Sequence, residues 1–272
     1  MTRDTGPTDE LDRYLFNEGT HRYLHRQFGA QPADGGCRFS VWAPNARSVA
    51  VAGSFDDWQH EHQLGPSESG VWSGWIDGAA VGDRYLYRVT TPTGDVVEKS
   101  DPVGAATEEP PSIVSVIADL DYEWGDDEWM AGRGGRVALD APMSIYELHL
   151  GSWGRHVTDG WRFPRYDELA DPIADHVLAH GFSHGEFLPI MEHPFYGSWG
   201  YQTTGFFAPS ARYGSPVDLM RMIDRLHQRG VGVILDWVPS HFPNDGHGLY
   251  EFDGTHLFEH CLLYTSDAAD EV

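Results

Sequence analysis

The chain has 272 residues and a mass of 30.4 kDa, so its length excludes a peptide or a lone small module and leaves room for one or two hydrophobic cores. Hydrophobic residues make up 40% of it, which is typical of a globular protein. With 18 Lys+Arg against 42 Asp+Glu, its formal net charge of -24 would repel phosphate backbones and anionic membranes. The composition therefore argues against a nucleic-acid or membrane-surface role and favours a neutral or cationic partner.

Lys99 is the single lysine of the chain, and Arg supplies the remaining cationic residues counted with it. An acidic, lysine-poor surface is typical of a saline habitat, and GC-rich coding bias produces the same composition. The two cysteines, Cys37 and Cys261, make no disulfide framework and no metal-binding spacing, which favours a reducing compartment. No apolar run approaches the length of a membrane span. We therefore predict a cytoplasmic protein with no membrane partner.

Short β-type segments follow one another at close intervals in the first half of the chain. They cover residues 38–42, 48–52, 71–76, 84–89 and 112–117. Turn sequences such as Asp77-Gly78 separate them, and this pattern predicts an antiparallel β-sandwich. We assign residues 1–125 to this domain, with an N-terminal extension. The acidic, turn-rich residues 121–135 are expected to connect it to the next domain.

Beyond Pro142 the pattern changes to strands that alternate with helices, which predicts βα units and a parallel sheet. The expected strands are residues 144–150, 184–188 and 231–235. One helix is expected between residues 166 and 180, with Asp171-Pro172 as its N-cap and first-turn pair.

The second helix has the clearest end signals. Ser215 can cap it, Pro216 suits its first turn, Asp218 lies near its positive end, and Gly230 follows its last turn. No Gly-x-Gly-x-x-Gly or Walker-type spacing accompanies these elements, so a nucleotide-binding enzyme lacks its usual motif.

Two features after the expected strands could carry chemistry. Asp236 directly follows the apolar third strand, and the carboxyl ends of strands face the active site in a βα barrel. The alternative is a solvent-facing Asp in an ordinary loop. Residues 191–205 are rich in aromatics, and Trp199, Tyr201 and Gln202 suit a sugar, whose apolar C–H face is rimmed by hydroxyls.

The alternative for this aromatic segment is that Phe195, Trp199 and Phe206 pack beneath a long loop. The 15 histidines include no His-Glu-x-x-His pair, so we predict no metal site.

Five segments resemble the glycogen branching enzymes of the α-amylase superfamily. The resemblance covers about residues 15–260, and a debranching enzyme would share the Asp236/His241 motif but not the run from Glu192 to Gln202. The five segments are LFNEGTH at 15–21, YELHLGSW at 146–153, FLPIMEHPF at 187–195, GSWGYQTTG at 197–205 and LDWVPSHF at 235–242.

The resemblance implies an immunoglobulin-like β-sandwich carbohydrate-binding module in residues 1–125. It implies the first part of a (β/α)8 TIM barrel, about strands one to three, in residues 126–260. Tyr201 would stack on the sugar at the cleavage site, His241 would hydrogen-bond the same sugar, and Asp236 would hold a neighbouring catalytic arginine. Trp199 and Gln202 are expected to contact substrate beside them.

Within the module, Trp58 is a candidate glucan-binding residue, whereas Trp72 is expected in the core. Two residues depart from the family pattern. Asp57 stands where a small residue such as Gly is expected, and Gly185 stands where the second barrel strand usually has a β-branched residue.

The chemistry that the resemblance implies is retaining transglycosylation of α-glucan, which needs no cofactor. One carboxylate attacks the anomeric carbon of an α-1,4 linkage, another protonates the leaving oxygen, and an acceptor 6-hydroxyl then resolves the glycosyl-enzyme. The nucleophilic Asp and the acid/base Glu are expected from later strands, beyond the end of this chain. Residues 261–272 do not continue the family pattern and are interpreted as a non-native tail.

This 272-residue chain is therefore expected to be a truncated, inactive piece of a monomeric branching enzyme, with an unstable barrel portion. The alternatives are a debranching or trehalose-forming hydrolase of the same superfamily, and a glucan-binding fragment without catalysis.

Overall fold

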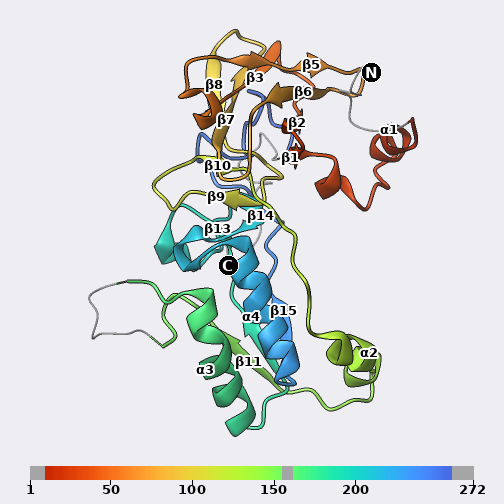
Figure 1. Ribbon diagram of the computed structural model, residues 1–272, viewed down its shortest axis with the longest axis vertical. Coiled ribbons are helices and arrows are strands. Elements are labelled where there is room, and N and C mark those ends of the chain that lie inside the picture. The colour runs from red at the N-terminus through yellow and green to blue at the C-terminus, as the bar shows by residue number, and fades with distance from the viewer. Residues whose placement is uncertain (1–9, 155–161, 259–272) are drawn as a thin grey trace, which may run out of the picture. The chain divides into compact units, whose positions relative to one another are not determined.

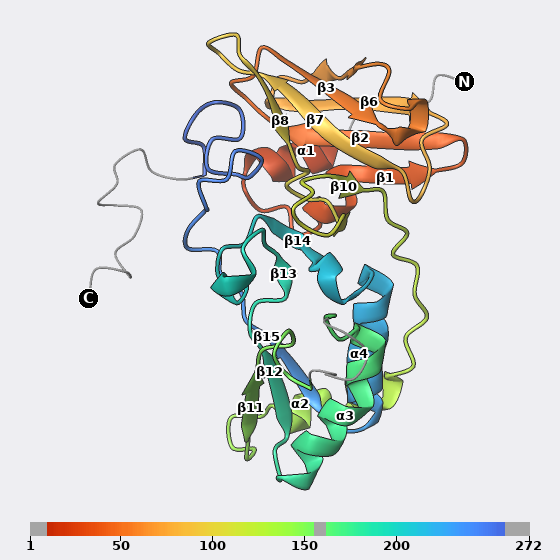
Figure 2. The same ribbon diagram turned by 90° about the vertical axis from the view of Figure 1, so that its left-hand side faces the viewer.

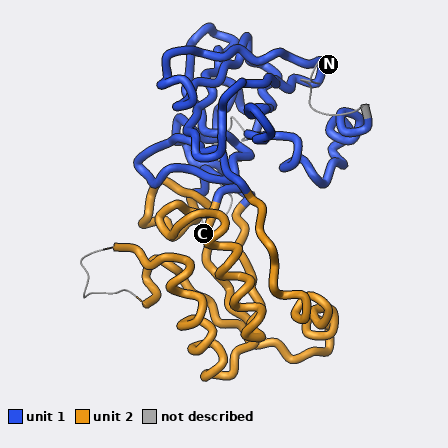
Figure 3. The backbone as a smooth tube through the Cα atoms, viewed as in Figure 1, with its two compact units in different colours: residues 1–119, 203–208, 239–272 blue, residues 120–202, 209–238 orange. Residues whose placement is uncertain are grey.

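The computed structural model describes residues 10–154 and 162–258 (Figure 1). The chain divides into two compact units (Figure 3), of which unit 1 comprises residues 1–119, 203–208 and 239–272 and unit 2 comprises residues 120–202 and 209–238. The predicted tail at 261–272, with Cys261, lies outside the described residues. Two segments that the sequence placed in the second domain thus group with the first, because Phe206, Leu249 and Phe252 are buried in its core.

Unit 1 is the predicted β-sandwich of two antiparallel sheets. One has the strand order β1-β2-β6-β5, and the other has the order β4-β3-β7-β10-β9, with β8 paired to β7 (Figure 2). The strands are β1 (Gly29–Ala33), β2 (Gly36–Trp42), β3 (Ser48–Gly53), β4 (His62–Gln63), β5 (Gly65–Pro66), β6 (Val71–Asp77), β7 (Arg84–Thr90), β8 (Val96–Lys99), β9 (Ala106–Thr107) and β10 (Ser115–Val116). Helix α1 (Glu10–Asn17) and the 3-10 helices η1 (Leu24–Arg26) and η2 (Ser54–Asp56) complete its N-terminal part.

Alternation along the strands places aromatic side chains in the sandwich core. Tyr85 and Tyr87 are fully buried on the inner face of β7, two residues apart as the pleat requires. Trp72 is also buried, and its Nε1 donates to the carbonyl of Ala43 at 2.9 Å, which confirms its predicted core position. Asp57 has a φ of 57°, a left-handed conformation that Asp tolerates better than most side chains, which explains the small residue expected there.

The sandwich core also contains a carboxyl group, that of Asp101. Its Oδ2 accepts hydrogen bonds from Tyr85 Oη at 2.6 Å and Tyr87 Oη at 3.2 Å, and its Oδ1 accepts from the Val103 amide at 2.9 Å. Burial raises the pKa of Asp101 from 3.8 to about 6, and these hydrogen bonds only partly oppose that rise. Between about pH 4 and pH 6 the folded sandwich therefore holds a proton on Asp101 that an unfolded chain would have released.

The free energy of unfolding of unit 1 should fall as pH rises from 4 to 7, because the native state binds a proton at Asp101 that the unfolded chain has released. At about 1.4 kcal/mol per pKa unit, a rise from 3.8 to about 6 makes this contribution about 3 kcal/mol. We expect D101N to remove that part of the pH profile, measured by urea unfolding of both proteins at several pH values. Parallel profiles would contradict the assignment.

Unit 2 contains three parallel strands in the order β11-β12-β15, with helices α3 and α4 packed side by side along the sheet (Figure 2). The predicted βα units are confirmed. The elements are α2 (Asp127–Arg136), β11 (Ile145–Leu148), α3 (Tyr166–Ala179), β12 (His184–Phe187), β13 (Met191–Glu192), η3 (Tyr196–Ser198), η4 (Ala211–Tyr213), α4 (Pro216–Gln228) and β15 (Gly232–Leu235), while β14 (Gly205–Pro209) begins in unit 1 and ends in unit 2.

Helix α4 begins as predicted. The Asp218 amide donates to Ser215 Oγ at 3.2 Å, and the Asp218 carboxylate accepts from the Ser215 amide at 2.9 Å. The start predicted for α3 is wrong, because Pro172 lies inside that helix rather than in its first turn. The buried face of α3 extends upstream to Tyr166, and its burial outweighs the backbone hydrogen bond lost at proline.

Helix α2 was also not predicted, because its glycines resemble a connection. Asp127 and Glu128 lie in its first turn and Arg133 and Arg136 in its last, which suits the helix dipole. The Trp129 side chain is buried and stacks on the His227 ring, with the ring centres 5.0 Å apart and the planes 12° from parallel.

At Gly185 in β12 an added Cβ would meet only ordinary contacts, the nearest at 3.8 Å, so no close packing requires glycine there.

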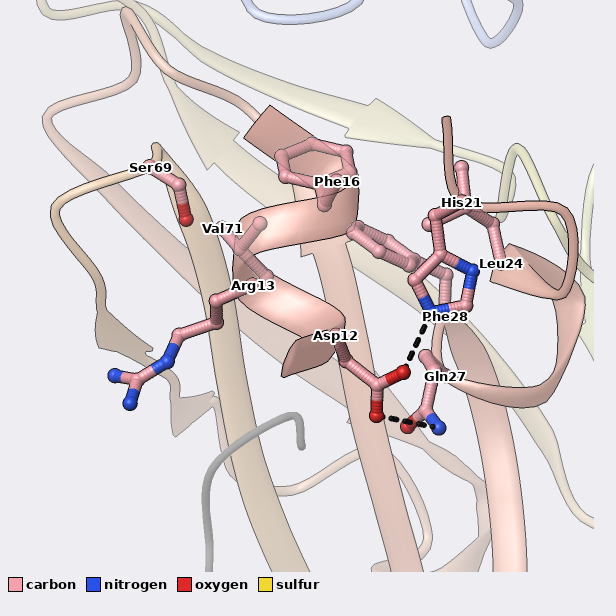
Figure 4. Close-up of a pocket in the computed structure, with 9 residues that line it drawn as sticks. All are labelled: Asp12, Arg13, Phe16, His21, Leu24, Gln27, Phe28, Ser69 and Val71. Atoms are coloured by element: carbon pink, nitrogen blue, oxygen red, sulfur yellow. Dashed lines mark hydrogen bonds and ion pairs between the residues drawn. The ribbon is translucent and has the colours of Figure 1, made fainter. Parts of the chain in front are cut away.

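A small pocket beside α1 has structural rather than binding character (Figure 4). Its cavity is about 10 Å³, about the space of one water molecule. Asp12 fills its polar side, accepting from Gln27 Nε2 at 3.3 Å and lying 2.7 Å from His21 Nε2.

Among the helices of the described residues, none is long and apolar enough to cross a membrane.

Candidate functional site

The predicted pair Tyr201 and Asp236 meets in unit 2. The Asp236 amide donates to the Phe187 carbonyl at 3.0 Å, which extends the pairing of β15 with β12 by one residue and fixes Asp236 at the carboxyl end of the strand. Its Oδ2 accepts a hydrogen bond from Tyr201 Oη at 2.6 Å. That hydrogen bond, together with desolvation, raises the pKa of Tyr201 to about 12, so the phenol remains a donor at neutral pH.

Two further carboxylates face this pair, and the sequence analysis missed them. Glu147 in β11 and Glu186 in β12 are register partners, so their side chains share one face of the parallel sheet. Their negative charges contribute to the raised pKa of Tyr201, which places them within electrostatic reach of its hydroxyl.

The loop between β13 and Gln202 exposes its aromatic rings. Phe195 is 60% exposed and Trp199 is 57% exposed, so the alternative that these two pack beneath the loop is wrong, whereas Phe206 is buried as that alternative required. The Trp199 ring lies 6.0 Å from the His149 ring, tilted by 30°. Gln202 is exposed beside Tyr201 in sequence. Exposed flat rings next to polar groups suit the apolar and hydroxylated faces of a sugar.

A buried ion pair between Glu192 and Arg212 stabilises this loop. Glu192 and Arg212 are each 5% exposed, and their Oε1 and Nη1 atoms lie 2.8 Å apart. Glu192 also accepts from Ser210 Oγ at 3.2 Å and from the Ala211 amide at 2.7 Å, while Arg212 Nη2 donates to the Pro194 carbonyl at 3.2 Å. The charges are therefore satisfied on both sides, as burial demands.

Gly200 fixes the other end of the loop, immediately before Tyr201. Its φ of 94° is unfavourable for L side chains, and an added Cβ would collide with the carbonyl oxygen of Pro189. Backbone geometry on one side and the ion pair of Glu192 on the other thus restrict where the Tyr201 ring can point.

The two remaining predicted residues, His241 and Trp58, belong to unit 1. His241 is half-buried, and its Nδ1 lies 3.5 Å from Ser240 Oγ. Trp58 is 43% exposed with a φ of 62°, so its ring is available to a ligand on the sandwich surface. Within residues 10–154 and 162–258, no group of three or more His, Cys, Asp or Glu side chains could hold a metal ion.

Comparison with known proteins identifies the sandwich. Residues 27–104 match the family described as carbohydrate-binding module 48, the isoamylase N-terminal domain. The sandwich of unit 1 is a carbohydrate-binding module of this family. The match spans β1 to β8. It includes β7, which carries the fully buried Tyr85 and Tyr87.

The chain as a whole, module included, is similar to branching enzymes. It is 56% identical over 255 residues to the 1,4-alpha-glucan branching enzyme GlgB of Aromatoleum aromaticum, covering 93% of this chain and 40% of that protein. The corresponding enzyme of Albidiferax ferrireducens is 53% identical over 254 residues, covering 92% of this chain and 40% of that protein. The chain thus spans about 40% of the length of these curated relatives.

The chain is also similar to solved structures of pullulanases. The type I pullulanase of Bacillus subtilis in complex with maltose matches with a TM-score of 0.63 and 26% identity, covering 82% of this chain and 34% of that one. A pullulanase variant from Paenibacillus barengoltzii in complex with maltotriose matches with a TM-score of 0.64 and 25% identity, covering 79% and 38% respectively. The three parallel strands of unit 2 are the start of an amylase-like domain.

Proposed function

We propose that this chain provides the glucan-binding first part of a 1,4-α-glucan branching enzyme, which cleaves α-1,4 linkages of glycogen-like chains and re-forms them as α-1,6 branches. The observation that carries the proposal is the Tyr201–Asp236 hydrogen bond of 2.6 Å at the carboxyl end of β15. It gives a protonated, oriented aromatic hydroxyl, and Trp199, two residues earlier in the chain, exposes a ring on which a sugar could stack. The named relatives are branching enzymes.

In this proposal Tyr201 stacks on the sugar at the cleavage site, and Asp236 fixes the Tyr201 ring and holds a catalytic arginine. His241 hydrogen-bonds the same sugar, and Trp199 and Gln202 contact the substrate beside them. Trp58 offers a further glucan contact on the module. We assign residues 1–125 to the module and residues 126–260 to about strands one to three of the barrel, in a monomeric cytoplasmic enzyme.

The proposal predicts that Y201A weakens binding of amylose to the 272-residue chain by about tenfold, which corresponds to about 1.4 kcal/mol. Removing the ring deletes both the stacking face and the donor that orients Asp236. Affinity electrophoresis in gels that contain amylose measures the effect. Y14A, which removes an exposed tyrosine from α1, serves as the matched control and should bind as the unmodified chain does. Equal retardation of Y201A and Y14A would contradict the assignment.

Catalysis by this chain alone is not part of the proposal. The retaining mechanism needs two carboxylates on neighbouring strand ends a few ångströms apart, which the resemblance assigns to later barrel strands. Incubation with linear amylose is therefore expected to yield neither α-1,6 linkages nor new reducing ends. New α-1,6 linkages would show that the chain branches glucan by itself, whereas reducing ends alone would favour a debranching or trehalose-forming hydrolase.

A further inference from the structure

Unit 1 contains a polar cavity that none of the predicted site residues lines. Its volume is about 300 Å³, at the lower end of the range of about 300–1,000 Å³ typical of small-molecule sites. It lies between the hairpin of β7 and β8 on one side and residues 244–254 on the other. The side chains that matter for its chemistry are Thr91, Thr93, Asp95, Lys99, Asp245, Tyr250 and Glu251.

The two walls of the cavity are joined by specific contacts. The Ser100 amide donates to the His247 carbonyl at 3.2 Å, and the Asn45 amide donates to Asp253 Oδ2 at 2.9 Å. Phe252 is fully buried in the sandwich core behind the cavity. Residues 244–254 are thus packed as part of unit 1, so the cavity is a built feature of the module.

Lys99 is the most unusual side chain of this cavity. It is 3% exposed, and among the described residues its Nζ makes one long hydrogen bond, 3.4 Å to the Gly248 carbonyl, although an ammonium group can donate three. The same Nζ lies 5.9 Å from the centre of the Phe252 ring. Burial lowers its pKa to about 8, while the negative charges of Glu251 and Asp253 oppose that shift. A buried donor with unused capacity is costly unless a ligand or water satisfies it.

The other side chains define which ligand fits. Asp95, Asp245 and Glu251 outnumber the single cation Lys99, so the cavity repels phosphates and other anions. Thr91 and Thr93 add hydroxyls, their Oγ1 atoms 2.7 Å apart, and Tyr250 adds an aromatic ring with a polar tip. Donors, acceptors and a flat ring together match a neutral polyhydroxylated molecule.

We propose that this cavity binds the end of a neutral α-glucan chain. This contact shares no residue with the Tyr201–Asp236 site. The choice of glucan rests on the proposed function, whereas the neutral, polyhydroxylated character of the ligand rests on the cavity itself. Such a contact would hold a long glucan on the module while another part of the same chain reaches the barrel.

The single lysine makes the test direct. N-hydroxysuccinimide acetate at pH 8 modifies amines, so the 272-residue chain offers two targets, Lys99 and the N-terminal amine, which peptide mass spectrometry separates. Maltotetraose is expected to slow acetylation of Lys99 several-fold and to leave the N-terminal amine, the internal control, unchanged. Glucose 6-phosphate is expected to protect less than maltotetraose. Equal protection by the phosphate would overturn the proposal, because the cavity would then be an anion site.

Variants separate this contact from the other site. T93Y places a ring at the exposed edge of the cavity and should abolish protection of Lys99, whereas T20Y, at an exposed threonine of the same unit, should retain it. Hydrogen exchange of β7 amides verifies that both variants fold. Y201A should also retain protection.

The outcomes distinguish the two proposals. If the chain is retarded by amylose but maltotetraose does not protect Lys99, the cavity proposal fails and the proposed function stands. If the chain shows neither retardation nor protection, both fail. Protection that survives in Y201A and disappears in T93Y establishes a separate glucan contact on the module.

Discussion

Replacing Glu192 with alanine is expected to destabilise unit 2 by about 3–5 kcal/mol, the usual cost of breaking a buried ion pair. Arg212 would remain at 5% exposure without the carboxylate that lies 2.8 Å from it. The Ala211 amide and the Ser210 hydroxyl, which now donate to Glu192, would also lose their acceptor. The cost is therefore desolvation without compensation, rather than the loss of one favourable contact.

Urea unfolding followed by hydrogen exchange at amides of β12 and α4 measures this effect on unit 2. D171A is the matched control, because Asp171 pairs with Arg225 and Arg229 on the surface, where solvent screens the charges. We expect D171A to change the unfolding free energy far less than E192A. Similar small effects of the two substitutions would show that Glu192 is not a structural support of the loop.

The Glu192–Arg212 ion pair also explains why the Tyr201 ring keeps a defined orientation although its loop is exposed. Glu192 anchors the start of the loop, and Gly200 turns the chain directly before Tyr201 at a φ of 94°. A partly unfolded loop would separate the Tyr201 hydroxyl from Asp236. E192A is therefore expected to weaken amylose binding as well as to lower the free energy of unfolding. E192Q keeps the shape of the side chain but not its charge, and it should also reduce both quantities.

Local signals in the sequence predicted the elements whose ends are set by their own residues. Ser215, Pro216 and Asp218 form the start of α4 because a cap needs only neighbouring groups. The start of α3 is set instead by burial of Tyr166, which Pro172 does not reveal. Helix α2 likewise depends on Trp129 stacking on His227, a contact between residues far apart in sequence.

The candidate site followed the same rule. Asp236 could be placed because it directly follows an apolar strand, and Tyr201 because aromatic residues gather around it. Glu147 and Glu186 could not, since their proximity to Tyr201 depends on the register of two strands. The cavity at Lys99 was beyond reach for the same reason, because residues 244–254 pack on a hairpin that lies about 150 positions earlier, as the Lys99–Gly248 separation of 149 shows.

Replacing Phe252 with alanine is expected to destabilise unit 1 by about 3–5 kcal/mol, the usual cost of removing a buried phenylalanine side chain. Phe252 is fully buried in the cluster that contains Tyr85 and Tyr87, and Asp253 beside it accepts from the Asn45 amide at 2.9 Å. The substitution would open a cavity in the sandwich core although the residue comes more than a hundred positions after the last sandwich strand β10 (Ser115–Val116).

Hydrogen exchange of β3 and β7 amides measures this effect on the sandwich itself. F207A is the matched control, because Phe207 belongs to the same unit but is half exposed, so its removal leaves no cavity. If F252A costs no more than F207A, the strands of the module are stable without residues 244–254. If it costs the expected amount, that segment completes the core of the module. Because the segment also forms one wall of the Lys99 cavity, F252A should then diminish the protection of Lys99 by maltotetraose, which links the stability of the module to the binding of its ligand.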